Sequence, residues 1–104
     1  MKLNGKRAAV LGLGSSGEAA GRLLHAHGAQ VTILDSGLPD PEKVHALQQI
    51  GISVIAGLSA DVAEADYDLA VLSPGIDPAF PIVQNFLRQG ASFIGELELS
   101  SRFC

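Results

Sequence analysis

The stretch Val10–Gly21, VLGLGSSGEAAG, places three glycines where a strand turns into a helix. Gly12, Gly14 and Gly17 form the pattern G-x-G-x-x-G directly after the apolar run Arg7–Leu11. In a strand–turn–helix unit the first glycine permits the tight turn, the second lets the backbone approach a phosphate, and the third allows close packing of the helix. This context predicts a phosphate-binding loop; a glycine turn needed only for packing is the alternative.

The composition is that of one compact globular domain. The chain has 104 residues, 47% hydrophobic and 17% charged, and no apolar run approaches the ~18 residues of a membrane span. The net charge of −4, without a Lys/Arg cluster, argues against a nucleic-acid partner. The single cysteine, Cys104, allows no disulfide within the chain and is typical of a reducing compartment. We therefore expect a cytoplasmic domain that binds neither nucleic acid nor a membrane.

Short apolar segments alternate with helical patterns along the whole chain. The expected strands are Arg7–Leu11, Gln30–Ser36, Ile52–Gly57, Asp68–Ser73 and Ser92–Gly95. Alternation of strands and helices with short connections predicts a parallel sheet with helices on both faces. The expected fold class is therefore α/β, Rossmann-like and doubly wound, with about five strands.

Each expected helix has recognisable start and stop signals. Ser15 or Ser16 is the expected N-cap of the first helix, Asp40 before Pro41 starts the second, and Pro81 starts the third. The expected apolar faces comprise Ala19, Ala20, Leu23, Leu24 and His27, then Val44, Leu47 and Ile50, then Ile82, Val83, Phe86 and Leu87. The glycines expected to end these helices are Gly28, Gly51 and Gly90.

Asp35 ends the second expected strand, eighteen positions after Gly17. In NAD-dependent enzymes an acidic residue at about this spacing binds the ribose hydroxyls. A carboxylate can also accept a hydrogen bond from a nucleobase. Uracil offers N3–H as a donor beside O4 as an acceptor, which matches the Asp35 side chain and the backbone N–H of Ser36. A turn-forming role for Asp35 is the third interpretation.

Several stretches together resemble one family. They are LGLGSSG (Leu11–Gly17), LDS (Leu34–Ser36), LSPGI (Leu72–Ile76) and IGELEL (Ile94–Leu99). Over essentially all of residues 1–104 the sequence is similar to the N-terminal domain of the Mur ligases, most of all that of the D-glutamate-adding ligases. The glycine loop alone is unspecific, whereas the SPGI turn and the G-[ED]-x-E-L pattern are more typical of this family.

The resemblance implies one Rossmann-like domain that holds the UDP part of UDP-MurNAc-L-Ala in a three-domain enzyme of peptidoglycan precursor synthesis. The enzyme's central and C-terminal domains, outside these 104 residues, would bind ATP with Mg²⁺ and bring the D-glutamate that attacks an acyl phosphate. The matching positions are Gly14, Ser15 and Ser16 for the diphosphate, Asp35 and Ser36 for the uracil, and Gly75 beside the nucleotide. No catalytic residue and no metal ligand is expected within this chain.

Two features depart from the family pattern. Gly37 stands where some members carry an arginine that covers the base, and no G-x-x-x-x-G-K-[ST] loop for ATP occurs. The catalytic centre is therefore expected outside this chain. A fourth helix is expected to begin at Glu96, which suggests the start of a longer protein. Two other functions stay open: an NAD(P)-binding module of an oxidoreductase, with Asp35 on the adenosine ribose, and a regulatory ligand-sensing domain.

Overall fold

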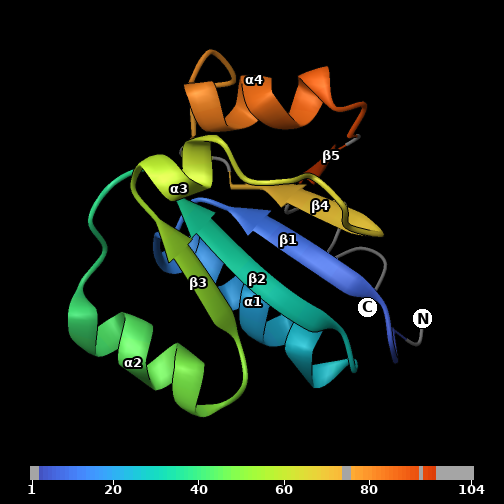
Figure 1. Ribbon diagram of the computed structural model, residues 1–104. Coiled ribbons are helices and arrows are strands. Elements are labelled where there is room, and N and C mark those ends of the chain that lie inside the picture. The colour runs from blue at the N-terminus through green and yellow to red at the C-terminus, as the bar shows by residue number, and fades with distance from the viewer. Residues whose placement is uncertain (1–2, 74–75, 92, 96–104) are drawn as a thin grey trace.

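The computed structural model describes residues 3–73, 76–91 and 93–95 (Figure 1). Within these residues, five strands form one sheet in the order β3-β2-β1-β4-β5. The strands are β1 (Arg7–Leu11), β2 (Gln30–Asp35), β3 (Ser53–Ala56), β4 (Leu69–Leu72) and β5 (Phe93–Gly95). Every pairing is parallel, which confirms the predicted α/β, doubly wound sheet.

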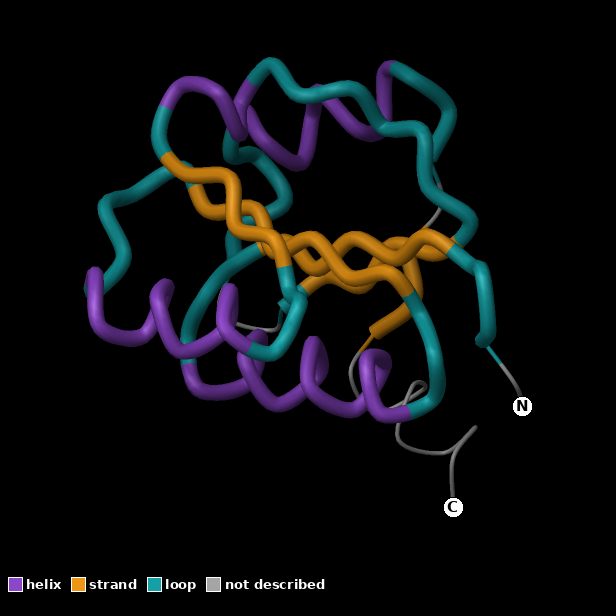
Figure 2. Tube along the Cα trace, turned by 60° about the horizontal axis from the view of Figure 1, so that its bottom comes forward, coloured by secondary structure: helices purple, strands orange, loops and turns teal. Residues whose placement is uncertain are grey.

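Helices lie on both faces of the sheet (Figure 2). Those of the described residues are α1 (Ser15–Ala26), α2 (Pro41–Gln49), α3 (Leu58–Asp61) and α4 (Pro81–Arg88). Residues of α1 and α2 belong to one hydrophobic cluster, and residues of α3 and α4 belong to the other. The sheet is thus covered on each side, as a buried parallel sheet requires.

The strand order reverses beside β1. From β1 the chain proceeds outward through β2 and β3, and it then returns to place β4 on the other side of β1. The carboxyl ends of β1 and β4 therefore form the switch point, where open α/β sheets bind their ligands. Residues 8–11 of β1 are fully buried, so this strand is a fixed support for whatever follows it.

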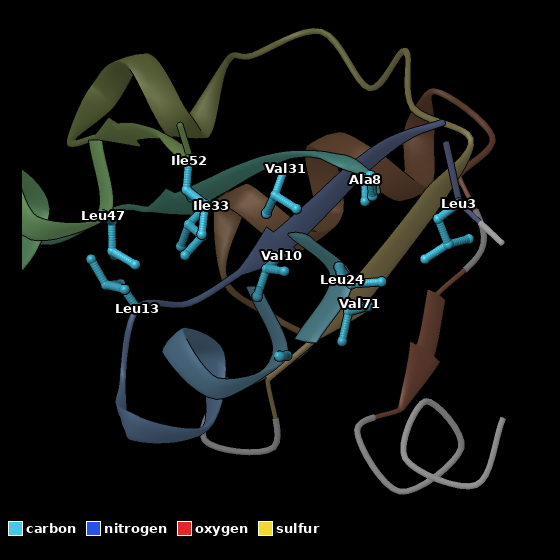
Figure 3. Packing of buried hydrophobic residues seen from close by; sticks show 12 residues of the cluster. Leu3, Ala8, Val10, Leu13, Leu24, Val31, Ile33, Leu47, Ile52 and Val71 are labelled. Atoms are coloured by element: carbon cyan, nitrogen blue, oxygen red, sulfur yellow. The ribbon is translucent and has the colours of Figure 1, made fainter. Parts of the chain in front are cut away.

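Alternating side chains of the strands build the two clusters. Val10 and Ile33 face α1 and α2, where Leu24 and Leu47 pack against them (Figure 3). On the other face Leu11, Leu34, Ala60, Ile82, Val83 and Phe86 are buried together. α1 packs close to β2 at Gly21, because a Cβ there would lie only 2.9 Å from Cδ1 of Ile33.

The start and stop signals of the later helices are confirmed. Asp40 is the N-cap of α2, and its side chain accepts a hydrogen bond of 3.0 Å from the Glu42 backbone N–H. Pro41 and Pro81 are the first residues of their helices. The glycines just beyond the C-caps have positive φ, as expected for left-handed helix stops: Gly28, Gly51 and Gly90.

Some local expectations are wrong. The N-cap of α1 is Gly14, not Ser15 or Ser16, because the helix already begins at Ser15. Three side chains expected on apolar faces are exposed: Ala19, Ile50 and Leu87. Ile50 is the C-cap of α2, where the helical spacing behind the prediction no longer applies. The helix expected from Glu96 lies outside the described residues.

Candidate functional site

The glycine loop begins with a sharp turn at Gly12. Its φ of +101° is a conformation that residues with a Cβ rarely adopt. The N–H of Gly12 donates a hydrogen bond of 2.7 Å to the Leu34 carbonyl, which extends the β1–β2 pairing by one residue. A Cβ at position 12 would also lie 2.9 Å from Cδ1 of Ile76, so the turn packs against the segment that follows β4.

The other two glycines of the motif differ in what surrounds them. A Cβ at Gly17 would collide with the carbonyl oxygen of Gly12, so the first turn of α1 lies directly on the loop. A Cβ at Gly14 would have no atom within 4 Å. The third glycine of the motif is therefore required for packing within this domain, whereas the space beside Gly14 is open for a ligand.

The first turn of α1 faces this open space with backbone donors. Gly14 is extended, with φ −101° and ψ −171°, and this N-cap residue has no side chain that could cap the helix. The first N–H groups of a helix have no acceptor within the helix, and the helix dipole adds a partial positive charge there. Ser16 is half-buried in this turn. Ser15 lies in the same turn, and its side chain is outside the described part of the structure.

Asp35 connects the end of β2 to the glycine loop. Its Oδ2 accepts a hydrogen bond of 2.8 Å from the backbone N–H of Leu13. Its Oδ1 accepts another of 2.8 Å from the backbone N–H of Gly37. The second bond is the Asx turn that the sequence allowed as one role of Asp35. A carboxylate has about four lone-pair positions, so two such bonds leave room for a ligand donor.

Of the two remaining predicted residues, the structure describes Ser36. Ser36 is exposed and directly follows Asp35. Ser73, at the end of β4, is buried, and its N–H donates to the Leu11 carbonyl at 3.1 Å. Gly75 lies outside the described residues. The structure thus brings Gly14, Ser16, Asp35 and Ser36 to the carboxyl edge of β1 and β2.

Two cations near α1 are held by one carboxylate. Glu18 Oε2 lies 2.9 Å from Nη2 of Arg22, and Glu18 Oε1 lies 3.5 Å from Nζ of Lys43 on α2. The hydrogen bond from Arg22 is the main reason that the pKa of Glu18 lies below its ordinary value of 4.5, and Lys43 acts in the same direction. Glu18 stands where a phosphate-loop lysine would follow the glycines. The groups that the loop offers to an anion are therefore backbone N–H groups.

The site offers anion and hydrogen-bond recognition. In residues 3–73, 76–91 and 93–95, no three His, Cys, Asp or Glu side chains gather in a way that would hold a metal ion. Over the same part of the chain, no helix is long and apolar enough to span a membrane. An open helix N-terminus beside a half-buried carboxylate suits a ligand with a phosphate at one end and a hydrogen-bond donor at the other.

The sequence indicated Asp35 and its possible Asx turn, but it did not indicate the hydrogen bond from Leu13. The Leu13 N–H is a backbone group, and it is separated from Asp35 by 22 positions. No residue type signals such a bond, because every non-proline residue carries an N–H. The spacing of the G-x-G-x-x-G motif from an acidic residue at the end of the next strand was the available signal.

The parallel sheet, its switch point and the glycine loop define the class: a Rossmann-like domain of the kind that binds nucleotide phosphates. The chain also matches the family model described as Mur ligase MurD-like, N-terminal domain, over residues 6–95. It therefore belongs to this family of Mur ligase N-terminal domains.

Curated relatives agree with this assignment. The chain is 39% identical over 103 residues to the UDP-N-acetylmuramoylalanine–D-glutamate ligase of Chlorobium luteolum, covering 98% of this chain and 22% of the relative. It is 42% identical over 98 residues to the enzyme of the same name from Halalkalibacterium halodurans, covering 93% and 22%. The chain thus spans about a fifth of the length of these relatives.

Solved structures show the same fold at lower identity. The UDP-N-acetylmuramate:L-alanyl-gamma-D-glutamyl-meso-diaminopimelate ligase from Neisseria meningitides matches with a TM-score of 0.78 and 21% identity, over 93% of this chain and 30% of that one. L-tryptophan dehydrogenase from Nostoc punctiforme matches with a TM-score of 0.64 and 22% identity, over 98% and 33%. Both a ligase and a dehydrogenase share this architecture, so the fold alone does not select the ligand.

Proposed function

We propose that this domain binds the UDP moiety of UDP-MurNAc-L-Ala for the ATP-dependent addition of D-glutamate in peptidoglycan precursor synthesis. One observation carries the proposal. The Asp35 carboxylate is tied by the Leu13 N–H to the loop that opens α1, so an acceptor for a base lies beside a helix N-terminus suited to a diphosphate. Membership of the MurD-like N-terminal family supports this choice of nucleotide.

The proposed contacts divide the nucleotide into two parts. Gly14, Ser15 and Ser16 face the diphosphate, since the space beside Gly14 is open and the first turn of α1 begins there. Asp35 accepts the uracil N3–H, and the backbone N–H of Ser36 donates to O4. Gly75, in the sequence SPG that follows β4, lies beside the nucleotide in this proposal.

The chemistry of the ligase would come from parts outside this chain. The relatives are more than four times as long, because this chain covers 22% of each, and the central and C-terminal domains of such an enzyme would hold ATP with Mg²⁺ and bring D-glutamate. ATP would supply the phosphoryl group that activates the substrate carboxyl as an acyl phosphate, and D-glutamate would supply the amine that displaces that phosphate. The role of the present residues is to hold the UDP end of the substrate so that its other end reaches that centre.

An NAD(P)-binding role is the second candidate. The position of Asp35 at the end of β2 also suits the hydroxyls of an adenosine ribose. In the UDP candidate Asp35 accepts a hydrogen bond from the uracil N3–H, whereas in the NAD(P) candidate it accepts from ribose hydroxyls. A comparison of the two ligands therefore separates the candidates.

The test is an amide NMR titration of this chain with UDP and, separately, with NADH. We expect UDP to shift signals in residues 12–17, 35–36 and 73–76 and NADH to do little. UDP has about 25 non-hydrogen atoms, so at ~0.3 kcal/mol each its affinity is limited to roughly micromolar. We expect high micromolar to millimolar binding, because the rest of the substrate site would lie on other domains. Shifts with NADH and none with UDP would overturn the proposal.

A further inference from the structure

Two leucine side chains stand almost entirely in solvent at the carboxyl edge of the sheet. Leu38 is 96% exposed and Leu58 is 83% exposed. Leu38 lies in the loop between β2 and α2, and Leu58 is the first residue of α3, which only Gly57 separates from β3. Neither belongs to a hydrophobic cluster of the described residues, so packing within that part of the fold does not require an apolar side chain at either position.

Each leucine directly follows a glycine that donates a hydrogen bond to Asp35. One glycine bonds to the side chain of Asp35 and the other to its backbone. Gly37 donates its N–H to Oδ1 of the Asp35 carboxylate. Gly57 donates its N–H to the Asp35 backbone carbonyl, at 2.9 Å. Leu38 therefore follows the bond to the carboxylate, whereas Leu58 continues from β3, one strand further from the glycine loop.

The approach to Oδ1 is open at Gly37. A Cβ at that position would come within 3.2 Å of Oδ1, and glycine leaves this space free. Ser36 has a small side chain, and Gly37 has none. Leu38 is thus the first large side chain after Asp35, one residue beyond the turn that the Asp35–Gly37 hydrogen bond closes.

We propose that Leu38 covers the flat face of the nucleobase whose edge bonds to Asp35. This inference rests on the proposed function. A pyrimidine has polar edges and weakly polar faces, so a carboxylate at the edge and an aliphatic side chain on the face satisfy both parts. Leu38 then sets the preference for a nucleotide over a bare diphosphate. Contact with a base would remove apolar surface of Leu38 from water, which favours binding.

The size of the effect follows from the area. Covering about half of a leucine side chain is worth roughly five- to twentyfold in affinity. Pyrophosphate has no base, so Leu38 contributes nothing to its binding. The ratio of UDP affinity to pyrophosphate affinity is therefore the quantity that reports on Leu38.

The experiment compares the unsubstituted chain with Leu38→Ser, Leu38→Met and the matched control Leu58→Ser. NMR titrations with UDP and with pyrophosphate give both affinities, and thermal unfolding reports on the fold. We expect Leu38→Ser to weaken UDP about five- to twentyfold and to leave pyrophosphate unchanged. Leu38→Met and Leu58→Ser should keep UDP binding within about twofold, because methionine retains an apolar side chain and Leu58 lies beyond β3. With Leu methyls labelled, nuclear Overhauser effects should connect Leu38 to H5 and H6 of the uracil.

The outcomes separate this inference from the function on which it rests. If the unsubstituted chain binds UDP and Leu38→Ser binds it equally well, the role of Leu38 is refuted and the UDP site stands. The same conclusion holds if Leu58→Ser loses as much UDP affinity as Leu38→Ser. If the unsubstituted chain binds pyrophosphate but gains nothing from the uridine of UDP, both proposals are overturned.

Discussion

The Oδ2 atom of Asp35 lies 2.8 Å from the backbone nitrogen of Leu13, and this hydrogen bond joins the end of β2 to the glycine loop. Leu13 is only 8% exposed, so its N–H has little access to water as a substitute partner. The same carboxylate therefore shapes the loop and, in the proposed function, receives the base. Its removal is expected to affect stability as well as binding.

Asp35→Ala should lower the free energy of unfolding. It removes an acceptor from a poorly exposed N–H, and a hydrogen bond to a charged group contributes about 1.5–3 kcal/mol. Asp35→Asn keeps one oxygen acceptor and should lose less. Ser36→Ala is the control, since an exposed neighbour should change stability by no more than about 0.5 kcal/mol. Urea unfolding measures all three, and equal midpoints for Asp35→Ala and Ser36→Ala would contradict the structural role of the carboxylate.

Substitution by alanine should affect stability very differently at Gly17 and at Gly14, two glycines of the motif. Gly17→Ala brings a Cβ into the Gly12 carbonyl oxygen and should cost about 3 kcal/mol or prevent folding. Gly14→Ala meets no atom within 4 Å, and its φ is negative, so stability should stay within about 1 kcal/mol. Gly14→Val should leave a folded chain that no longer binds UDP. Thermal unfolding with UDP titration checks this, and a stable Gly17→Ala variant would show that the loop packs differently.

Much of this architecture is predictable because local signals and tertiary structure agree. The bounds of β1 match the predicted strand Arg7–Leu11, since a central strand is buried over most of its length, here over residues 8–11. Asp40 and Pro41 start α2 as expected, because capping depends on neighbouring residues alone.

Predictions that depend on packing were less reliable. Leu87 fits the apolar spacing of α4 but is 45% exposed, because periodicity does not show how wide the buried face of a helix is; here that face consists of Ile82, Val83 and Phe86. Gly14 replaces Ser15 and Ser16 as N-cap, since backbone geometry at a glycine loop overrides the usual preference for a hydroxyl. The Asp35–Leu13 bond depends on the β1–β2 register and has no local signature.

Stability should depend on pH through Glu18. Its pKa lies below the ordinary value of 4.5, chiefly because Arg22 donates a hydrogen bond to the carboxylate. A carboxyl group with a lowered folded-state pKa contributes stability that is present above its unfolded pKa and lost as the pH falls through the folded value. The midpoint of unfolding should therefore decrease as the pH is lowered below 4.5. This decrease should be smaller for Glu18→Gln.

The Glu18 contribution is expected to be small and to weaken with added salt, because both Arg22 and Glu18 remain accessible to solvent. Midpoints measured from pH 3 to pH 7 at low and high salt provide the test. If the unfolding midpoints of Glu18→Gln and the unsubstituted chain depended identically on pH, the ion pair would not contribute to stability.

This chain by itself should catalyse nothing. Acyl-phosphate formation brings the substrate carboxylate and the γ-phosphate of ATP together, and it needs Mg²⁺ and cationic side chains to offset their charge. The cations found near the loop, Arg22 and Lys43, are paired with Glu18. Incubation with UDP-MurNAc-L-Ala, D-glutamate, ATP and Mg²⁺ should release no phosphate above a protein-free control. Turnover that persists in Gly14→Val and disappears on heat denaturation would reveal a separate catalytic site.

The central claim is that Asp35 binds the uracil edge while the start of α1 binds the diphosphate. The most direct test compares the affinities of this chain for UDP and CDP. Both ligands carry the same ribose and diphosphate, so only the base edge differs. Uracil presents N3–H to the carboxylate, whereas cytosine presents a bare N3 and would leave its own and the protein's groups mispaired. We predict at least a tenfold preference for UDP, or about 1.4 kcal/mol. Equal affinities for UDP and CDP would contradict base recognition by Asp35, and NADH binding more tightly than either would favour the dinucleotide role.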